Sequence, residues 1–393
     1  MLIQEKVKQA VELLREFGVD CWITFVRETG LVRDPILDFL LLADVTWHSA
    51  LIVTRQGKTL AIVGKYDQQT VQDTGAYGEV IGYVEGFRAP LQEAIRQIDP
   101  AKIAVNYSKD SEICDGITHG MFLILQEVLG EIGYADRIVS SEKIISALRQ
   151  RKTEAELERI RRAIRETLAI FDEVRGFIRP GRTEIEIAEF MKERVRERGL
   201  QLAWDEAYCP GVFTGPATAE AHYHPTERKV QRGHVLNMDF GVKYEGYCSD
   251  LQRTFYVLEE GETQAPAEVR RGFETIVESI ERAKSLLKPG VQGVEVDRAA
   301  REFIVSQGYE EFPHALGHQV GRFAHDGTAL LGPAWEKYAS KPFERIEEGM
   351  VFTIEPRLTV PDRGVVTIEE MVVVTKDGAK WLSKPQKELW LIQ

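Results

Sequence analysis

Residues 235–257 read VLNMDFGVKYEGYCSDLQRTFYV, and this stretch decides how the second half of the chain is interpreted. Two strand-like runs flank a turn near residues 244–246, which is typical of a β-hairpin. With the turn centred there, Asp239 faces Asp250 across the two strands, with β-carbons roughly 5 Å apart. The alternate positions of the first strand are apolar and predict a buried opposite face: Leu236, Met238 and Phe240.

The facing aspartates predict a cation site. Two carboxylates held together repel each other, and partial burial forces one of them to take a proton. A hard divalent cation removes this conflict, because carboxylate oxygens are its preferred ligands. The alternative interpretation is a surface hairpin in which the aspartates pair with Lys243 or Arg253. The hairpin taken alone leaves both interpretations open.

The histidines gather in the second half of the chain, which holds six of the eight. Three of these lie within twelve positions of one another, in FPHALGHQVGRFAHDG: His314, His318 and His325. Gly317 and Gly321 flank His318 and let the backbone and a metal approach closely. This clustering favours a site over three separate structural histidines. His224 and His234 are interpreted as ordinary surface histidines.

Two apolar strands near the C-terminus each carry a glutamate. MVFTIEPRL contains Glu355 and VVTIEEMVVV contains Glu369, each at the end of a Thr-Ile-Glu triplet. A glutamate that alternates with Val and Met points where it loses its water, which costs several kcal/mol unless it gains a partner. The alternative is an edge strand with its polar face in water. Glu370 alternates to the other side and is predicted to face solvent.

The first 150 residues alternate strand-like runs with amphipathic helices. An opening helix over residues 4–17 precedes CWITFV, and HSALIVT, TLAIVGK, EVIGYVEG and KIAVNYS follow. Helical patterns such as LQEAIRQI and GITHGMFLILQEVLG lie between them. This order predicts an α/β layer domain with a largely buried sheet. No GxGxxG opens a helix after a strand and no GxxxxGK[ST] occurs, so the sequence gives nucleotide binding no support.

A charged helical stretch over residues 148–178 joins this part of the chain to the next. We place the boundary near residue 150, which predicts domains over residues 1–150 and 151–393. In the second domain two helical stretches lead into antiparallel-looking strands, and two more, at about 267–287 and 293–307, lead into strands again. The second domain is therefore predicted to be α+β, with an internal pseudo-repeat of helix, helix and strands.

Composition limits the classes of function. The 393 residues are too many for one typical core, which agrees with two domains. The net charge of −12, from 50 Lys+Arg against 62 Asp+Glu, argues against a nucleic-acid or anionic-membrane partner, which would need a basic face. No stretch is apolar enough for a signal peptide or a membrane span. Four scattered cysteines without a CxxC pair indicate reduced thiols, so we expect a soluble, cytoplasmic protein.

Five segments together carry a family resemblance: AEAHYHPTERKVQRGHVLNMDFG, GYCSDLQRTF, FPHALGHQVGRFAHD, MVFTIEP and GVVTIEE. Their order of Asp, Asp, His, Glu and Glu resembles the pita-bread metallopeptidases, which include methionine aminopeptidases, aminopeptidase P and prolidase, with creatinase as a metal-free relative. The spacings of His222 from Asp239 and of His318 from His325 fit the prolidase and aminopeptidase P branch. The resemblance covers residues from about 150 to 390. The first 150 residues resemble the creatinase-type N-terminal domain in length and element order.

The resemblance implies a role for each matching residue. Five of them are implied to hold two divalent metal ions: Asp239, Asp250, His318, Glu355 and Glu369. Asp239 is implied to chelate one metal, Asp250 and Glu369 to bridge both, and His318 and Glu355 to complete the second. Paired metals lower the pKa of a bridging water toward roughly 7 and supply hydroxide at neutral pH. Three catalytic roles follow, with Glu355 as proton shuttle and His222 and His325 at the scissile amide. His314 is implied to line the substrate pocket.

Three positions depart from the pattern of Xaa-Pro enzymes. Thr367 stands where they usually carry arginine, Gln252 where they carry a hydroxyl residue, and Arg357 begins the segment where they have glycine, an apolar residue and tyrosine. The N-terminal part also offers residues 41–44, LLAD, in place of the family's Tyr-Leu-Thr-Gly segment. All five ligands remain, so these departures bear on substrate choice and on the surroundings of the metals.

The leading hypothesis is a dinuclear metal-dependent hydrolase, an Xaa-Pro aminopeptidase or dipeptidase that acts on small peptides. A second hypothesis on the same fold is a hydrolase or lyase of a small non-peptide metabolite, and a third is a non-catalytic binding homologue. Manganese is our first expectation for the metal, and cobalt, zinc and iron suit the same ligands. By analogy with this branch we expect a homodimer, and we expect neither a nucleic-acid nor a membrane partner.

Overall fold

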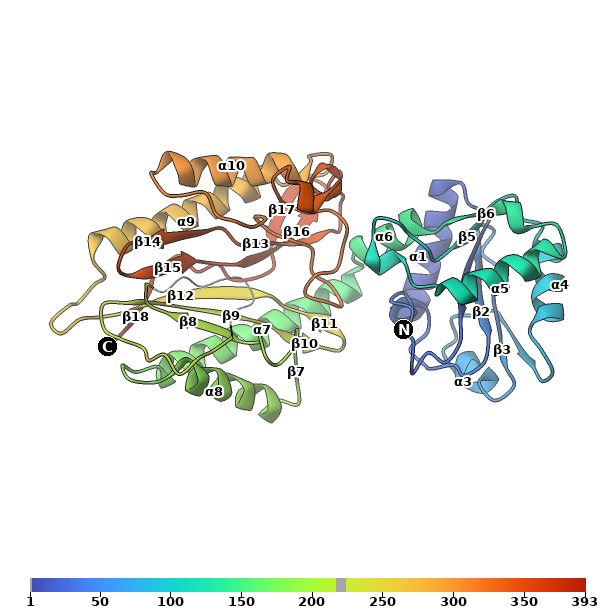
Figure 1. The fold of residues 1–393 in the computed structure, drawn as a ribbon, viewed down its shortest axis with the longest axis horizontal. Coiled ribbons are helices and arrows are strands. Elements are labelled where there is room, and N and C mark those ends of the chain that lie inside the picture. The colour runs from blue at the N-terminus through green and yellow to red at the C-terminus, as the bar shows by residue number, and fades with distance from the viewer. Residues whose placement is uncertain (1, 217–223) are drawn as a thin grey trace. The chain divides into compact units, whose positions relative to one another are not determined.

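The structure is a computed structural model that describes residues 2–216 and 224–393. The chain divides into two compact units, Met1–Arg149 and Gln150–Gln393, which are described separately (Figure 1). Among the described residues, no helix combines the length and the apolar character needed to cross a bilayer.

The N-terminal unit is built on one six-stranded sheet with the order β4-β3-β2-β1-β5-β6. Its strands are β1 Cys21–Val26, β2 Ser49–Thr54, β3 Thr59–Gly64, β4 Glu79–Tyr83, β5 Ile103–Val105 and β6 Ile138–Ser140. Strands β1, β2 and β3 pair antiparallel, whereas β4, β5 and β6 join the sheet in parallel. The helices are α1 Leu2–Phe17, α2 Leu37–Leu40, α3 Gln68–Asp73, α4 Arg88–Ile98, α5 His119–Gly130 and α6 Glu142–Gln150, with short 3-10 helices at Glu112–Cys114 and Ala135–Arg137.

Helices cover both faces of this sheet, as β1 illustrates (Figure 1). Trp22 and Val26 pack into a core with α1 and α6, whereas the alternating Ile23 and Phe25 pack into a second core with α4 and α5. Side chains of a strand alternate between faces, so a strand covered on both sides must be apolar at nearly every position. The run CWITFV meets that need, and all six of its residues are buried.

The C-terminal unit contains four long helices and the remaining strands. The helices are α7 Glu154–Phe177, α8 Glu184–Glu197, α9 Ala267–Leu286 and α10 Gly293–Ser306, with short 3-10 helices at Glu336–Tyr338 and Lys341–Phe343. The first strands are β7 Gln201–Leu202, β8 Gly211–Thr214, β9 Val235–Phe240, β10 Val242–Tyr244, β11 Tyr247–Cys248 and β12 Leu251–Val257. The later strands are β13 Val351–Ile354, β14 Arg357–Val360, β15 Gly364–Thr367, β16 Glu370–Thr375, β17 Gly378–Trp381 and β18 Trp390–Ile392.

The strands of this unit lie between two pairs of helices (Figure 1). Strands β18-β12-β9-β8 form one sheet and β13-β16-β17 another, with smaller sheets of β11-β10-β7 and β14-β15. Helices α9 and α10 pack over the later strands through a core that includes Phe273, Ile304 and Phe352. On the other side, Phe171 of α7 meets Phe240 of β9 edge to face, with ring centroids 5.7 Å apart. Along the chain, two helices lead into strands twice in succession.

The charged stretch over residues 148–178 is not one helix. Helix α6 ends at Gln150 and α7 begins at Glu154, because Thr153 caps the new helix. The Thr153 side chain accepts a hydrogen bond from the Glu156 amide, and the Glu156 side chain accepts one from the Thr153 amide. This reciprocal capping box satisfies two amides that a helix start otherwise leaves unpaired, so the helix restarts at this point.

Candidate metal centre

The hairpin predicted over residues 235–257 is present, but its predicted register is wrong. Asp239 lies opposite Gln252 and not opposite Asp250. The turn is centred one residue later than predicted, because Glu245 and Gly246 both take positive φ values, of 44° and 80°, between the paired Tyr244 and Tyr247. A two-residue turn of this kind matches the natural twist of the strands.

The corrected register still keeps the two aspartates on one face. Moving the turn centre by one residue shifts the pairing by two, and a two-residue shift preserves the face on which a side chain lies. Asp250 is therefore a diagonal neighbour of Asp239 instead of its direct partner. Next to the aspartates, Gly241 allows the two backbones to approach closely, since a β-carbon there would lie 2.0 Å from the Ser249 carbonyl oxygen. The predicted buried face is confirmed, with Leu236, Met238 and Phe240 fully buried.

Four of the five proposed ligands lie on or directly beside strands in different parts of the unit. Asp239 lies on β9 and Asp250 directly precedes β12, whereas Glu355 directly follows β13 and Glu369 directly precedes β16. An isolated bridge between Gln252 and Glu369 joins the aspartate hairpin to β16. His318 lies between α10 and β13, and its carbonyl accepts a hydrogen bond of 2.9 Å from the Thr353 amide. Backbone pairing therefore brings the hairpin, the histidine segment and the two glutamate strands to one place.

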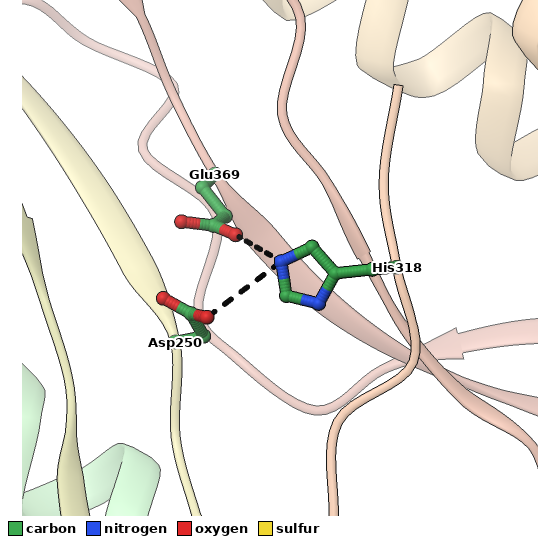
Figure 2. Close-up of side chains that lie close together, drawn as sticks. All are labelled: Asp250, His318 and Glu369. Carbon is green, nitrogen blue, oxygen red and sulfur yellow. Dashed lines mark ion pairs between the residues drawn. The ribbon is translucent and has the colours of Figure 1, made fainter. Parts of the chain in front are cut away.

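His318 lies at the centre of the acidic group. Its Nε2 atom is 3.7 Å from Asp250 Oδ2, 3.3 Å from Glu355 Oε1 and 3.8 Å from Glu369 Oε1. Figure 2 shows Asp250 and Glu369 pointing from neighbouring segments toward the edge of this imidazole. One ligand atom from each of Asp250, His318 and Glu369 lies within 4.8 Å of the other two. That spacing is compact enough for all three to reach one cation.

Burial and mutual repulsion perturb the carboxylates of this group. Burial, together with the charges of Asp250 and Glu355, raises the pKa of Asp239 well above its usual range. Burial raises the pKa of Asp250 to about 7, with the His318 charge opposing and the Glu355 charge adding to that effect. Burial, followed by the charges of Asp250, Glu355 and Asp239, raises the pKa of Glu369 well above its usual range. Three carboxylates that resist ionisation in one place are the signature of a site built for positive charge.

The imidazole supplies part of that positive charge. Burial by itself disfavours the cationic form of His318, but its hydrogen bond to Glu355 and the nearby carboxylate charges raise its pKa to about 9. Burial likewise works against ionised Glu355, yet the contact with His318 and the charges of His314 and His325 hold the Glu355 pKa below its usual value. The carboxylates around His318 thus favour a positive charge at this position.

Two carboxylate oxygens show that the group is incomplete by itself. Asp239 Oδ1 and Glu369 Oε2 are buried without a hydrogen-bond partner among the described residues. Nearly all buried polar atoms in folded proteins have a partner. These two oxygens therefore indicate that the site binds a group, such as a cation, that carboxylate oxygens can coordinate. Four carboxylates and one imidazole fit a divalent cation such as manganese, iron, cobalt or zinc. The residues present therefore fit the metal that the resemblance implies.

The other histidines differ in their distance from the group. The His325 ring lies 4.1 Å from the His318 ring, at a tilt of 48°. His314 is close enough for Glu355 to act on it electrostatically, and burial lowers the His314 pKa, which favours its neutral form. His222 lies outside the described residues. Elsewhere, His224 is exposed and lies against Tyr208, whereas His234 is half-buried beside Gly215.

Gln252 and Thr367, which depart from the family pattern, contact each other beside the ligands. The Thr367 hydroxyl donates to Gln252 Oε1 at 3.0 Å, and Gln252 Nε2 donates to Glu355 Oε2 at 3.4 Å. Thr353 donates to the other oxygen, Glu355 Oε1, also at 3.4 Å. Sequence reasoning singled out Gln252 and Thr367 as departures but did not predict that they pair. Arg357 lies directly opposite Thr367 in the β14–β15 ladder.

The prediction that Glu370 faces solvent is wrong. Its side chain is 1% exposed and lies 3.1 Å from Arg253, which is equally buried. Ser383 and the Gln386 amide donate further hydrogen bonds to the same carboxylate. The error has a physical cause: β16 is covered on both sides, so the residue that alternates away from the metal site enters a second interior instead of water.

We predict that Glu370→Ala destabilises the protein by about 3–5 kcal/mol, because it leaves a buried, unpaired Arg253 guanidinium. Urea unfolding of the purified variant measures this loss. The matched control is Glu347→Ala, which removes a carboxylate 2.7 Å from Arg151 at a half-exposed position. That loss is expected to stay within about 1 kcal/mol. Equal losses for the two variants would contradict the role assigned to burial.

The whole chain was compared with known proteins. The model of metallopeptidase family M24 matches residues 158–376. The chain is 32% identical over 253 residues to an Xaa-Pro dipeptidase from Pyrococcus furiosus, covering 63% of this chain and 67% of that relative. It is 25% identical over 389 residues to an Xaa-Pro dipeptidase from Pyrococcus horikoshii, covering 99% of each. The solved structure of an X-Pro aminopeptidase from Thermotoga maritima matches with a TM-score of 0.74 at 26% identity, over 97% of this chain and 100% of that one. The resemblance carried by the five motifs is confirmed, and the chain belongs to metallopeptidase family M24.

Proposed function

We propose that this metallopeptidase cleaves the Xaa-Pro bond at the free N-terminus of small peptides, as an aminopeptidase or a dipeptidase, with two divalent cations. The observation that carries the proposal is the group of Asp250, His318 and Glu369, with Glu355 3.3 Å from the same imidazole. Relatives named for Xaa-Pro substrates over most of this chain support the substrate class.

Five residues would hold the cations: Asp239, Asp250, His318, Glu355 and Glu369. Their carboxylates carry more negative charge than the buried site tolerates alone, which is why their pKa values are raised at Asp239, Asp250 and Glu369. Bound divalent cations supply a nucleophile at neutral pH by lowering the pKa of water, and they polarise the scissile carbonyl. Manganese is the metal we propose to test first.

The remaining roles belong to residues around the ligands. In spite of its burial, Glu355 keeps a pKa below its usual value through its contact with His318, so it stays ionised, and we assign it the transfer of a proton from the attacking water to the leaving amine. We assign to His325, whose ring lies 4.1 Å from the His318 ring, the donation of a hydrogen bond to the scissile amide, and we assign the same role to His222. His314 is half-buried and tends to its neutral form, which suits a residue that lines the substrate pocket.

Cleavage assays test the proposal directly. The purified, manganese- or cobalt-loaded enzyme is offered Xaa-Pro dipeptides, Xaa-Pro-Yaa peptides and peptides that begin with methionine. We expect cleavage of the proline-containing sets and strong loss in Asp250→Ala and His325→Ala. No cleavage across the panel, with metal shown to be bound, would reject the peptidase substrate class. Metal analysis under saturating manganese is expected to give close to two equivalents, and less than one would reject the site.

A second candidate is a hydrolase or lyase of a small non-peptide metabolite on the same fold. The contact that favours it is the Thr367–Gln252–Glu355 chain, which stands where Xaa-Pro enzymes usually have arginine and a hydroxyl residue. These hydrogen bonds reach Glu355, the proposed proton shuttle, and so alter the surroundings of the residue that would protonate the leaving group. Inactivity on every peptide, together with full metal binding, would turn attention to this candidate.

We predict that Gln252→Ala lowers kcat/KM by about 10–100-fold while leaving metal content unchanged. The reason is that Gln252 holds one Glu355 oxygen without belonging to the proposed ligands. Thr367→Val, which removes the hydroxyl that orients the amide, is expected to give a smaller loss, and Thr367→Ser is expected to retain activity. Steady-state kinetics with metal analysis check this order. Loss of metal in Gln252→Ala would show that it acts on the ligands instead.

We further propose that residues 1–150 form a creatinase-type domain and that residues 151–393 form the catalytic domain. The six-stranded sheet with helices on both faces supports the first assignment, and the position of every proposed ligand after residue 238 supports the second. We also propose a cytoplasmic homodimer. Four buried cysteines without a disulfide among the described residues support a reducing compartment.

A further inference from the structure

We propose that the buried pair of Asp297 and Arg301 on α10 is a positioning device that sets the path of residues 312–316 and, through them, the places of His314 and Glu355. This inference rests on the roles proposed above for His314 and Glu355. Neither Asp297 nor Arg301 belongs to the five motifs, and no sequence pattern pointed to them.

The pair is an ion pair with two parallel contacts. Arg301 Nε donates to Asp297 Oδ2 and Arg301 Nη2 donates to Asp297 Oδ1, both at 2.7 Å. The Arg301 side chain is 8% exposed and the Asp297 side chain is 2% exposed. A buried ion pair seldom stabilises a fold more than apolar residues of the same size, because both charges lose their water. Helix α10 has a capping box at Gln292 and an apolar face, so the pair has another purpose than forming the helix.

Most of the other hydrogen bonds of the pair go to one neighbouring segment, residues 312–316, and Arg301 Nη1 also donates to Glu311 Oε1 at 3.3 Å. Arg301 Nη1 donates to the Phe312 carbonyl at 2.6 Å, and Nη2 donates to the His314 carbonyl at 2.7 Å. Asp297 Oδ1 accepts from the Leu316 amide at 3.1 Å. The guanidinium also lies over the Phe312 ring, 3.9 Å from its centroid. Three alternate residues are thus held through backbone atoms, which fixes the course of the segment.

This segment leads directly into the metal centre. The Leu316 carbonyl accepts a 2.7 Å hydrogen bond from the Glu355 amide, so the residue held by Asp297 holds the proposed proton shuttle. Gly317 follows with no room for a side chain, since a β-carbon there would lie 2.0 Å from the Thr353 carbonyl oxygen. His318 comes next. A displacement of residues 312–316 would therefore move His314 and Glu355 together, and misplacement by about 1 Å costs up to 100-fold in rate.

The test compares Arg301→Lys with two controls. Lysine keeps the positive charge but is a point donor, so it cannot hold both carboxylate oxygens and two carbonyls at once. Ile304→Ala removes buried side-chain volume from the same helix and lowers thermal stability, but it keeps both members of the ion pair. Arg282→Gln breaks a pair of the same spacing on α9, with Glu278 2.9 Å away, where both side chains are half-exposed.

Two readouts are made on metal-loaded, full-length protein: steady-state kinetics on an Xaa-Pro peptide, and hydrogen exchange of peptides that cover residues 312–318. For Arg301→Lys we expect faster exchange in this segment, a rise in KM, and a fall in kcat/KM of about 10–100-fold, with unchanged metal content. Ile304→Ala is expected to lower the melting temperature without changing KM or kcat, and Arg282→Gln to change neither.

Unchanged exchange over residues 312–318 in Arg301→Lys would overturn the inference, and so would faster exchange with normal kinetics. A kinetic loss in Ile304→Ala equal to that in Arg301→Lys would also overturn it, because general destabilisation would then suffice. If the wild-type enzyme cleaves no peptide, the proposed function fails, and the exchange measurement alone then decides whether the pair holds the segment.

Discussion

Asp250→Asn is expected to lower peptidase activity by more than about 100-fold, since even the outer partners of metal ligands cost 10–100-fold when removed. The same substitution is expected to stabilise the metal-free protein. Asp250 is 5% exposed, and burial raises its pKa to about 7, so the ionised form is held at a penalty near pH 8. The shift from 3.8 to about 7 sets an upper bound on the order of 4 kcal/mol for that penalty. A neutral amide of the same shape avoids it.

The sign of the stability change is expected to reverse once metal is added. Manganese stabilises the wild type by binding its folded state, and the variant, which lacks a proposed bridging carboxylate, gains less. Melting temperatures measured near pH 8 with a chelator and with saturating manganese check both signs. Glu370→Gln is the control, because Glu370 is buried and paired with Arg253 outside the ligand set. Glu370→Gln is expected to destabilise both the chelated and the manganese-loaded protein. If chelated Asp250→Asn is less stable than chelated wild type, the proposed penalty for holding Asp250 ionised is refuted.

Hairpin and strand patterns in the sequence were enough to predict which residues lie together, but not their pairing. The patterns placed Asp239, Asp250, Glu355 and Glu369 on strands; in the structure Asp239 lies on β9, and each of the other three lies directly beside the end of a strand. The register of the hairpin was wrong because it depends on which two residues accept positive φ, and Tyr244-Glu245-Gly246 allows two choices. The face survived the error, since a shift by two residues preserves it.

Contacts that arise only from tertiary packing were not predictable. Period-two alternation says that Glu370 lies opposite Glu369, but it does not say whether the far side of β16 meets water or a second interior. In the sequence, Asp297 and Arg301 are only an acidic and a basic residue four positions apart on a helix, and such pairs usually contribute little to helix stability. Only the packing of residues 312–316 against α10 makes that pair buried and places three backbone groups within its reach. The Gln252–Thr367 contact has the same origin, because the isolated bridge between Gln252 and Glu369 brings residues 367–369 beside β12.

The metal-free protein is also expected to lose stability as pH rises from about 6 to about 8.5. Asp250 has a pKa raised from 3.8 to about 7, so its favourable contribution is complete below the unfolded pKa and is lost as pH rises through 7. His318 has a pKa raised from 6.5 to about 9, so its contribution is complete below 6.5 and is lost as pH rises through 9. Glu355, whose pKa is lowered, contributes fully above 4.5 and adds no slope in this range.

The two slopes act in the same direction and together amount to several kcal/mol, at about 1.4 kcal/mol for each pKa unit. A change of that size lowers the melting temperature by on the order of 10 °C in a unit of this length.

Metal binding works the other way, because the ligands must be deprotonated and affinity therefore rises with pH. The gap in melting temperature between manganese-loaded and chelated protein should widen steadily over the range. Comparing the two forms at each pH cancels the general repulsion of a chain with a net charge of −12, which both share. In Asp250→Asn this gap in melting temperature should widen less between about pH 6 and pH 7. If the chelated wild type instead gains stability as pH rises, a charged cluster held together by a protonated His318 is ruled out.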